Sequence, residues 1–281
     1  MGSTMLASPL SALAEFVGRH RRLFVLTGAG CSTESGIPDY RDADGQWKRT
    51  PPISFQAFMG SPLARSRYWA RSMAGWRHFG KAEPNDAHRA LAKLEAAGRV
   101  ERLVTQNVDG LHQAAGSRAV VDLHGRLDHV RCMECGRREP RKVFQARLEA
   151  RNPGWVGLSG RMAPDGDADL ESVDFSGFRV PACLACGGIL KPDVVFFGEP
   201  VPAERISSAL AALQVSDAIL VVGSSLMVHS GYRYVRAGAQ AGLPVAAVNL
   251  GRTRADDLLA LKVELPCAQA LSFVFEEACA D

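Results

Sequence analysis

Four cysteines occur as two Cys-x-x-Cys pairs, Cys132 with Cys135 and Cys183 with Cys186. A glycine follows each pair directly, and it would let the chain bend sharply enough to aim both sulfurs inward. Two such pairs in one chain favour a closed, four-sulfur zinc site over the alternative, a redox-active dithiol. With no open ligand position, such a site would hold a small domain together and would take no part in catalysis.

A glycine-rich loop follows residues 22–26, which are apolar and are predicted to form a short buried strand. Gly28 and Gly30 would let backbone amides approach a pyrophosphate at the start of a helix. Thr33 stands where the dinucleotide fingerprint has its third glycine, and Pro38 would end a helix early. A plain tight turn therefore remains an alternative. An ordinary hydride-transfer dehydrogenase is disfavoured relative to an enzyme that does something else to a dinucleotide.

Polar residues follow two further predicted strands. Asn107 and Asp109 come after strand 100–105, and His124 comes after strand 119–123. An imidazole whose pKa lies near neutrality suits proton abstraction at physiological pH. From the residues alone, a structural histidine and helix-capping roles for the other two side chains remain open.

Strands and helices alternate along most of the chain. We predict a helix that begins at Pro9 and three further helices over residues 86–97, 203–215 and 232–241. The predicted strands are residues 22–26, 100–105, 119–123, 218–222 and 245–248. Strands that are apolar throughout and alternate with helices indicate a parallel sheet covered on both faces. The pattern predicts an α/β fold with a Rossmann-like, doubly wound sheet, whose ligands bind at the carboxyl ends of its strands.

Two segments interrupt this alternation and are predicted to form a smaller inserted domain. Residues 47–81 should supply its helical part and residues 131–187 its zinc module. The Rossmann-like domain then consists of residues 1–46, 82–130 and 188–281.

Composition excludes several classes of protein. The chain has 281 residues, of which 47% are hydrophobic, and 33 Lys and Arg against 30 Asp and Glu give a net charge of +3. Without a basic block we expect no nucleic-acid partner, and without a long apolar run we expect no membrane span. No secretion signal or clear mitochondrial presequence is visible, and the cysteine pattern suits a reducing compartment. We therefore expect a bacterial-type cytoplasmic protein, with a monomer as the default.

Several of these residues lie in longer motifs that resemble the sirtuin family, in the family's order. The resemblance runs from about residue 20 to residue 270 and rests on residues 28–41, 105–109, 124–125, the two cysteine pairs, 191–199, 223–225 and 248–251. It implies an NAD-dependent protein-lysine deacylase that consumes NAD as a co-substrate, holds one structural zinc ion and acts on an acylated-lysine protein or peptide.

The resemblance also implies the roles of individual residues. His124 would act as general base on a ribose hydroxyl after nicotinamide has left, and Asn107 and Asp109 would lie around the nicotinamide ribose. The products would be nicotinamide, free lysine and O-acyl-ADP-ribose. The implied NAD contacts are Gly28, Ala29, Gly30, Ser32, Pro38, Asp39, Tyr40, Arg41, Gln106, Asn107, Asp109, Gly223, Ser224, Ser225, Asn249, Leu250, Gly251 and Cys267.

Two departures from the commoner family pattern are mild. Cys31 stands where an aliphatic residue is usual, and Tyr40 stands where Phe is frequent. Taken by itself, Cys31 is expected to be a small buried hydrophobic residue.

The resemblance implies that the substrate contacts two parts of the chain, one that binds its peptide backbone and one that binds its acyl group. An extended peptide would pair with the segment that holds Val194, Val195, Phe196 and Gly198, although a buried core strand is the alternative there.

Finer details are similar to class II, the group of the fourth human sirtuin. They are residues 68–71, 163–167 and 230–233. Tyr68 and Arg71, three residues apart on a predicted helix, would hold the carboxylate of an acidic or longer acyl group, such as glutaryl or 3-hydroxy-3-methylglutaryl. An ordinary amphipathic helix surface is the alternative, and residues 151–178 could either reach the acyl pocket or form an exposed loop.

Two other functions compete with deacylation. The same fold could serve mainly as a protein mono-ADP-ribosyltransferase. A non-catalytic, zinc-stabilised NAD-sensing protein is the alternative of another class.

Overall fold

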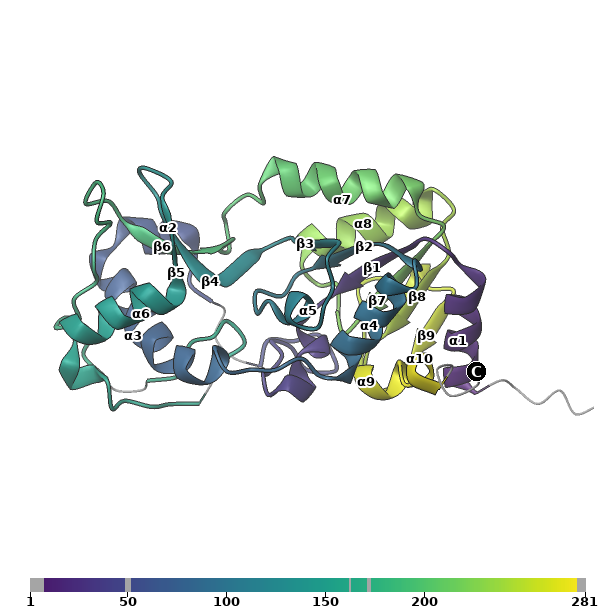
Figure 1. The fold of residues 1–281 in the computed structure, drawn as a ribbon, viewed down its shortest axis with the longest axis horizontal. Coiled ribbons are helices and arrows are strands. Elements are labelled where there is room, and N and C mark those ends of the chain that lie inside the picture. The colour runs from purple at the N-terminus through teal and green to yellow at the C-terminus, as the bar shows by residue number, and fades with distance from the viewer. Residues whose placement is uncertain (1–7, 49–51, 162, 171–172, 277–281) are drawn as a thin grey trace, which may run out of the picture.

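A computed structural model of the chain describes residues 8–48, 52–161, 163–170 and 173–276 (Figure 1). Its larger sheet has six parallel strands in the order β3-β2-β1-β7-β8-β9. These strands are β1 (Leu23–Thr27), β2 (Val100–Thr105), β3 (Val120–Asp122), β7 (Ala218–Val222), β8 (Val245–Val248) and β9 (Leu261–Val263). The predicted doubly wound α/β fold is confirmed, and its strand order is the Rossmann order.

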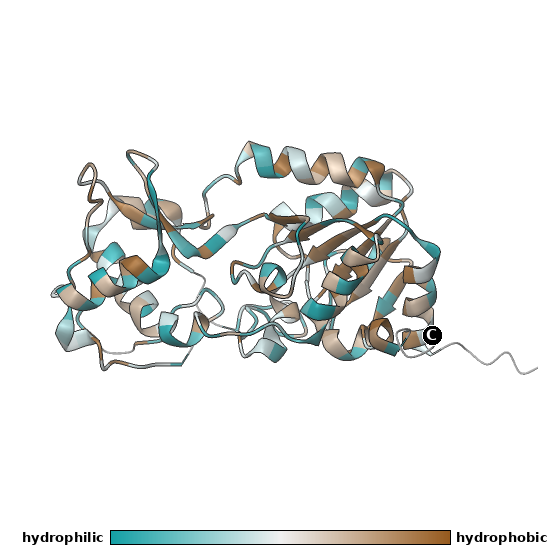
Figure 2. Cartoon of the chain, in the orientation of Figure 1, coloured by the Kyte–Doolittle hydropathy of each residue, from teal (hydrophilic) through white to brown (hydrophobic). Residues whose placement is uncertain are grey.

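Helices cover both faces of this sheet. One face carries α1 (Pro9–Arg19), α4 (Asp86–Ala96), α9 (Cys267–Ala270) and α10 (Phe273–Glu276), and the other carries α7 (Ala203–Val215) and α8 (His229–Gln240). The period-two alternation of β1 explains this arrangement, because Leu23 and Val25 pack into one core while Phe24 and Leu26 pack into the other. Figure 2 shows the strands of this sheet as its most hydrophobic elements.

A second, smaller region lies beside the large sheet (Figure 1). It holds a three-stranded antiparallel sheet in the order β5-β4-β6 and a core of its own. Its elements are α2 (Phe55–Gly60), α3 (Pro62–Phe79), β4 (Gly125–Cys132), β5 (Arg138–Pro140), α6 (Arg141–Arg151) and β6 (Leu190–Val194). Trp69 lies at the centre of this core, fully buried, with its ring against Phe144.

The predicted strands and helices of the large sheet are confirmed within a few residues, except that α8 begins at His229 and not at Tyr232. The sequence did not predict β4, β5, β6, α6 or β9. Strand β4 alternates buried and accessible residues and carries charged side chains, so it lacks the apolar run that marked the other strands. Because β4 and β6 pair with each other, we propose moving the domain boundaries from residues 130/131 and 187/188 to about residues 124/125 and 194/195.

Four 3₁₀ turns and one short helix complete the fold. They are η1 (Ala29–Cys31), η2 (Thr33–Ser35), η3 (Pro153–Trp155), η4 (Asp256–Leu258) and α5 (Leu111–Ala114). Among the residues that the structure describes, no helix is long and apolar enough to cross a membrane.

Candidate active site

A cavity of about 600 Å³ opens at the carboxyl edge of the large sheet. The sheet order reverses between β1 and β7, where parallel α/β sheets form their ligand crevice. The loops after β1, β2, β3, β7 and β8 all reach this point. The predicted site residues that line the cavity are Gly28, Ala29, Gly30, Asp39, Tyr40, Arg41, Tyr68, Gln106, Asn107, Asp109, His124, Val194, Val195, Phe196, Gly198, Gly223, Ser224, Ser225, Asn249, Leu250, Gly251 and Cys267. Ser32, Pro38 and Arg71 are not among the lining residues.

The glycine loop after β1 packs directly against the loop after β7. The Gly30 amide donates to the Gly223 carbonyl at 2.8 Å, and Gly223 has φ +62°. A Cβ on Gly223 would lie 2.2 Å from the Cys31 nitrogen, and one on Gly28 would lie 2.8 Å from the Ser224 Cβ. These two glycines are therefore required for the two loops to pack against each other, whether or not a ligand also approaches the backbone there.

A buried polar network fixes the loops after β1 and β2 relative to each other. The Ser32 hydroxyl donates to Asp109 Oδ2 at 2.7 Å, and the Asn107 amide donates to Ser32 Oγ at 3.0 Å and to the Gly28 carbonyl at 2.9 Å. Burial raises the pKa of Asp109, although the Leu111 amide and the Ser32 hydroxyl hold it down in part. Ser32 thus supports the cavity wall from behind.

The tautomer of His124 follows from its partners. Its Nδ1 lies 2.9 Å from the Gln106 carbonyl oxygen, which can only accept, so Nδ1 carries the proton. Its Nε2 then holds a lone pair, which accepts from the Ser230 hydroxyl at 2.8 Å. Burial lowers the pKa of His124 to about 4, partly offset by the Gln106 carbonyl. The side chain is therefore neutral at physiological pH, and burial places its pKa below the near-neutral value expected from the sequence.

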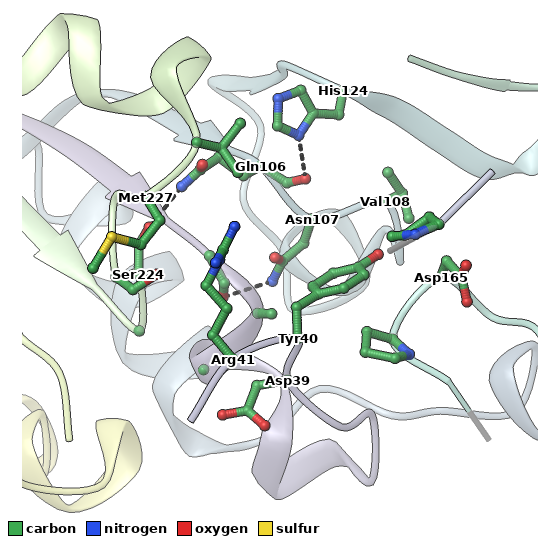
Figure 3. A pocket seen from close by; sticks show the side chains of 18 of the residues that line it. Asp39, Tyr40, Arg41, Gln106, Asn107, Val108, His124, Asp165, Ser224 and Met227 are labelled. Atoms are coloured by element: carbon green, nitrogen blue, oxygen red, sulfur yellow. Dashed lines mark hydrogen bonds between the residues drawn. The ribbon is translucent and has the colours of Figure 1, made fainter. Parts of the chain in front are cut away.

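The loop after the glycine turn covers one side of the cavity (Figure 3). The Arg41 guanidinium lies 4.0 Å from the centre of the Trp47 ring, and its Nη1 donates to the Gly45 carbonyl. Tyr40 makes an edge contact with the same indole, and burial raises the pKa of its phenol. Lys48 pairs with Asp39. Contacts between aromatic and charged side chains within the loop thus fix its conformation. Arg41 and Tyr40 lie in the cavity wall in this conformation.

Loops after the later strands form the opposite side of the cavity. The Gln106 amide donates to Ser224 Oγ at 2.7 Å, which joins the loops after β2 and β7. The Asn249 side chain donates to the Gly251 carbonyl at 3.0 Å and so stabilises the turn after β8. Cys267 is buried, with its sulfur 3.6 Å from the Gly30 carbonyl oxygen.

The inner end of the cavity, beside Tyr68, is aromatic. The buried Tyr68 packs against Phe58 and Phe196. Asp165, from the segment that precedes residue 170, also lines the cavity, and burial raises the pKa of its carboxyl group. The insert thus reaches the cavity here, although residues 162 and 171–172 lie outside the described part of the chain.

Arg71 is separated from this wall. Its Nη2 pairs with Asp169 Oδ1 at 2.8 Å, and its Nε donates to the Ala168 carbonyl at 3.1 Å. Arg71 and Tyr68 therefore share a helix, but only Tyr68 lines the cavity.

The segment after β6 forms the wall next to His124. The Val195 amide donates to the His124 carbonyl at 2.8 Å, and Phe197 forms a parallel bridge with Ser54. Val194 and Phe196 are buried, whereas Phe197 is 41% exposed, so the segment alternates between core and surface. Buried Lys191 pairs with Glu199 at 3.1 Å behind it.

The four paired cysteines meet at the far end of β4. The Cys132 and Cys186 sulfurs are 3.5 Å apart and the Cys135 and Cys183 sulfurs are 3.8 Å apart. Tetrahedral zinc with Zn–S bonds of about 2.3 Å needs sulfurs about 3.8 Å apart, whereas a disulfide needs about 2.05 Å. Both following glycines have positive φ, which is compatible with the sharp bend expected there from the sequence. The donor set and spacing fit one structural zinc ion.

Three residues at the site carried no recognised role in the sequence. Ser230 bonds His124, Asp165 lines the cavity and Trp47 stacks on Arg41. Ser230 and Asp165 belonged to the class II details, but nothing local in the sequence pointed to these contacts.

Comparison with known proteins agrees with this geometry. A family model described as the Sir2 family matches residues 28–230. A protein of Bordetella bronchiseptica named NAD-dependent protein deacetylase is 68% identical over 267 residues, covering 95% of this chain and 97% of the relative. A protein of Xanthomonas campestris pv. campestris with the same name is 68% identical over 263 residues, covering 94% of this chain and 90% of the relative.

A solved structure described as "Sir2-p53 peptide-NAD+" is similar over the whole fold. It is 30% identical, has a TM-score of 0.75, and covers 97% of this chain and 99% of its own. The family model spans more than half of the chain, and the relatives match it almost throughout. The chain therefore belongs to the Sir2 family, the sirtuins.

Proposed function

We propose that this protein is an NAD-dependent protein-lysine deacylase. The two bacterial relatives are named NAD-dependent protein deacetylases, and the solved neighbour holds NAD⁺ and a peptide. In this reaction the acyl oxygen of the modified lysine attacks the ribose carbon of NAD that bears nicotinamide, and nicotinamide leaves. A ribose hydroxyl then takes up the acyl group, and water releases free lysine, giving O-acyl-ADP-ribose.

The observation that carries the proposal is the neutral His124 on the cavity wall. Its Nε2 lone pair has one partner, the Ser230 hydroxyl at 2.8 Å, which a ribose hydroxyl can replace. The Gln106 carbonyl holds the proton on Nδ1 and so keeps the accepting nitrogen toward its partner. His124 is therefore the general base, and it needs no deprotonation near pH 7.

The loops around the cavity have the donors that a dinucleotide needs. Arg41 supplies a guanidinium for phosphate, and Ser224, Ser225 and Asn249 supply hydroxyl and amide groups at the ends of β7 and β8. Asn107 and Asp109 belong at the nicotinamide ribose, with Gln106 beside them. Tyr40 excludes water from the reacting carbon. Pro38 and Ser32 act by shaping the loops, since neither lines the cavity.

The acylated peptide is proposed to pair with the segment from Val194 to Gly198. Its neighbour His124 then lies beside the acyl-lysine, because the Val195 amide is bonded to the His124 carbonyl. The lysine chain would enter between Phe196 and His124, both of which line the cavity.

For the acyl group we propose a preference for longer or acidic chains, as in class II. The cavity continues past His124 to Tyr68, leaving space beyond an acetyl group. For an acidic acyl chain, Arg71 must exchange its Asp169 partner for the substrate carboxylate, and Asp165 opposes that charge. Arg71 thus favours the binding of an acidic acyl group and Asp165 disfavours it. Tyr68 favours longer acyl groups whatever their charge.

The zinc ion would be held by Cys132, Cys135, Cys183 and Cys186 and would supply no chemistry beyond fixing β4 against β6. We further propose that the protein acts as a monomer in a bacterial cytoplasm, in keeping with its free thiols and its bacterial relatives.

The experiment is a panel of acetyl, glutaryl and 3-hydroxy-3-methylglutaryl peptides with NAD, read by mass spectrometry. Deacylation predicts nicotinamide, free lysine peptide and O-acyl-ADP-ribose in equal amounts. ADP-ribose attached to protein, without acyl-ADP-ribose, would indicate the transferase instead. NAD binding with no nicotinamide from any peptide would indicate the sensor.

A further inference from the structure

A second cluster of metal-ligand side chains lies behind the glycine loop. Cys31, His88 and His112 each offer one ligand atom, and these atoms lie within 4.8 Å of one another. All three residues are at most 1% exposed. They come from η1, α4 and α5, and none of them lines the cavity.

The two imidazoles are oriented as metal ligands would be. His112 Nε2 lies 2.8 Å from Thr27 Oγ1, while its buried Nδ1 has no hydrogen-bond partner. His88 Nδ1 lies 2.9 Å from Asn85 Oδ1 and 3.3 Å from the Asn85 backbone nitrogen. The shorter contact is to an oxygen that can only accept, so it places the proton on Nδ1 and leaves Nε2 with only the Ser32 hydroxyl at 3.5 Å. In each ring one nitrogen is thus held by an outer oxygen and the other is free, which is the second-shell pattern of metal-bound histidines.

We propose that Cys31, His88 and His112 form a second metal site, for a thiophilic divalent ion such as Zn²⁺. The ligands would be the Cys31 sulfur, His88 Nε2 and His112 Nδ1. A fourth position is left for the Ser32 hydroxyl or a water molecule. Tetrahedral zinc needs nitrogen and sulfur ligands about 3.3–3.5 Å apart, so the cluster must contract by up to about 1.5 Å on binding.

Charge and protonation suit this assignment. Burial lowers the pKa values of His88 and His112, so both imidazoles are neutral and ready to coordinate. Burial raises the pKa of Cys31, so the thiol proton must leave to solvent as the sulfur–metal bond forms. The ion and the thiolate together carry one positive charge, which the carboxylate of neighbouring Asp109, bonded to Ser32, can balance.

A route to the cluster passes Asn85. This residue lines a surface depression whose charged side chains are Glu34, Glu83, Asp86, Lys81 and Arg89. Arg89 pairs with Asp86 at 3.0 Å, and the charges of the depression sum to one negative charge. Its side-chain amide donates to the Cys31 carbonyl at 2.9 Å, and its Oδ1 faces His88. Rotation of one side chain would connect the depression with the ligands. An ion bound behind it would fix the loop that carries Gly28 and Gly30.

The test counts ions per chain. The full protein is loaded with zinc, passed through a desalting column and analysed by inductively coupled plasma mass spectrometry. Wild type should retain two zinc ions per chain, and Cys31→Ala should retain one. The matched control Cys267→Ala removes another buried thiol beside the glycine loop and should still retain two ions.

Two results would overturn the proposal: one ion per chain in wild type, or two ions in Cys31→Ala. Circular dichroism checks that the variant folds. Should it fail to fold, His112→Asn replaces it with the same expectation. NMR of wild type provides a second readout, because the second ion should shift the ring signals of His88 and His112 and leave His129 unchanged.

Discussion

The two ends of strand β4 differ in how they are built. His124 immediately precedes this strand, and Cys132 is its last residue, roughly 25 Å away at the ordinary rise of a strand. At the cysteine end, two tight turns supply all four ligands. At the His124 end, the cavity is lined by the segments after β1, β2, β3, β6, β7, β8 and β9, which all have to meet.

One end of the strand therefore serves stability, and the other end holds the residues proposed for catalysis. Zinc closes the cysteine end, and no ligand position is left there for a substrate. At the other end, a carbonyl and a hydroxyl hold His124, and the Nε2 lone pair that accepts from this hydroxyl is the group that we propose as the base. Because β4 and β6 run side by side between the two ends, the cysteine end also sets the position of the wall next to His124.

Loss of a zinc ligand should give the largest effect. Cys186→Ala removes one of four thiolates, so zinc binding, worth on the order of 10 kcal/mol in small zinc modules, is largely lost. We expect the β4–β6 region to unfold and kcat/KM for deacylation to fall by roughly 100-fold or more. Zinc content, circular dichroism and kinetics measure this. Ala185→Ser, in the same turn, is the control and should keep all three properties; full activity in zinc-free protein would show that the two ends are independent.

Lowering the pH should decrease the free energy of unfolding through protonation of His124. The folded-state pKa of His124 is about 4, against an ordinary value of about 6.5, so the unfolded chain binds more protons between these values. The stability contributed by neutral His124 is complete above pH 6.5 and is lost as pH falls toward 4.

Comparing wild type with His124→Gln isolates this effect from the aspartates whose raised pKa values act in the opposite sense. Over that range, wild type should lose about 3 kcal/mol of unfolding free energy more than the variant does. Urea denaturation at several pH values measures it. Parallel pH curves for the two proteins would contradict the buried, neutral assignment.

Acyl selectivity should change with Arg71. Replacing it by Met removes the charged partner for an acidic acyl group, worth about tenfold in kcat/KM for glutaryl relative to acetyl peptide. Arg77→Met is the matched control, because Arg77 lies on the same helix and contacts Leu158 of the insert. An acyl ranking that stays the same in Arg71→Met would remove Arg71 from the site.

The smallest effect is expected at Ser230. Ser230→Ala frees Nε2 of His124 for the ribose hydroxyl but leaves a buried acceptor unpaired in the free enzyme. We expect kcat/KM to rise about threefold while stability falls by about 1 kcal/mol. Ser230→Thr keeps the hydroxyl and should behave like wild type. A fall in kcat/KM in Ser230→Ala would instead make this hydroxyl part of the catalytic arrangement.

Sequence predicted the features that are specified locally. Spacing alone identified Cys132 and Cys135 as a ligand pair, and apolar runs located the strands of the large sheet. The carboxyl ends of parallel strands placed His124 and Asn107 near a ligand site, but their catalytic roles came from the resemblance to the sirtuins.

Other features depend on contacts between distant segments. Ser230 reaches His124 from the start of α8, and Arg71 is turned to Asp169 by a loop 98 residues further on. Strand β4 was missed because its charged residues follow a half-exposed pattern. The cluster around Cys31 has no motif at all, since its three ligands approach one another only when α4 and α5 pack behind the glycine loop.

We propose that His124 Nε2 performs the proton abstraction that leads to O-acyl-ADP-ribose. The most direct measurement is the rate of O-acyl-ADP-ribose formation by His124→Ala with acetyl peptide and NAD, together with its zinc content and melting temperature. We expect the rate to fall by roughly 10²–10⁴-fold, with zinc retained and the fold intact. Turnover close to that of wild type in a folded, zinc-containing variant would show that His124 is not the general base.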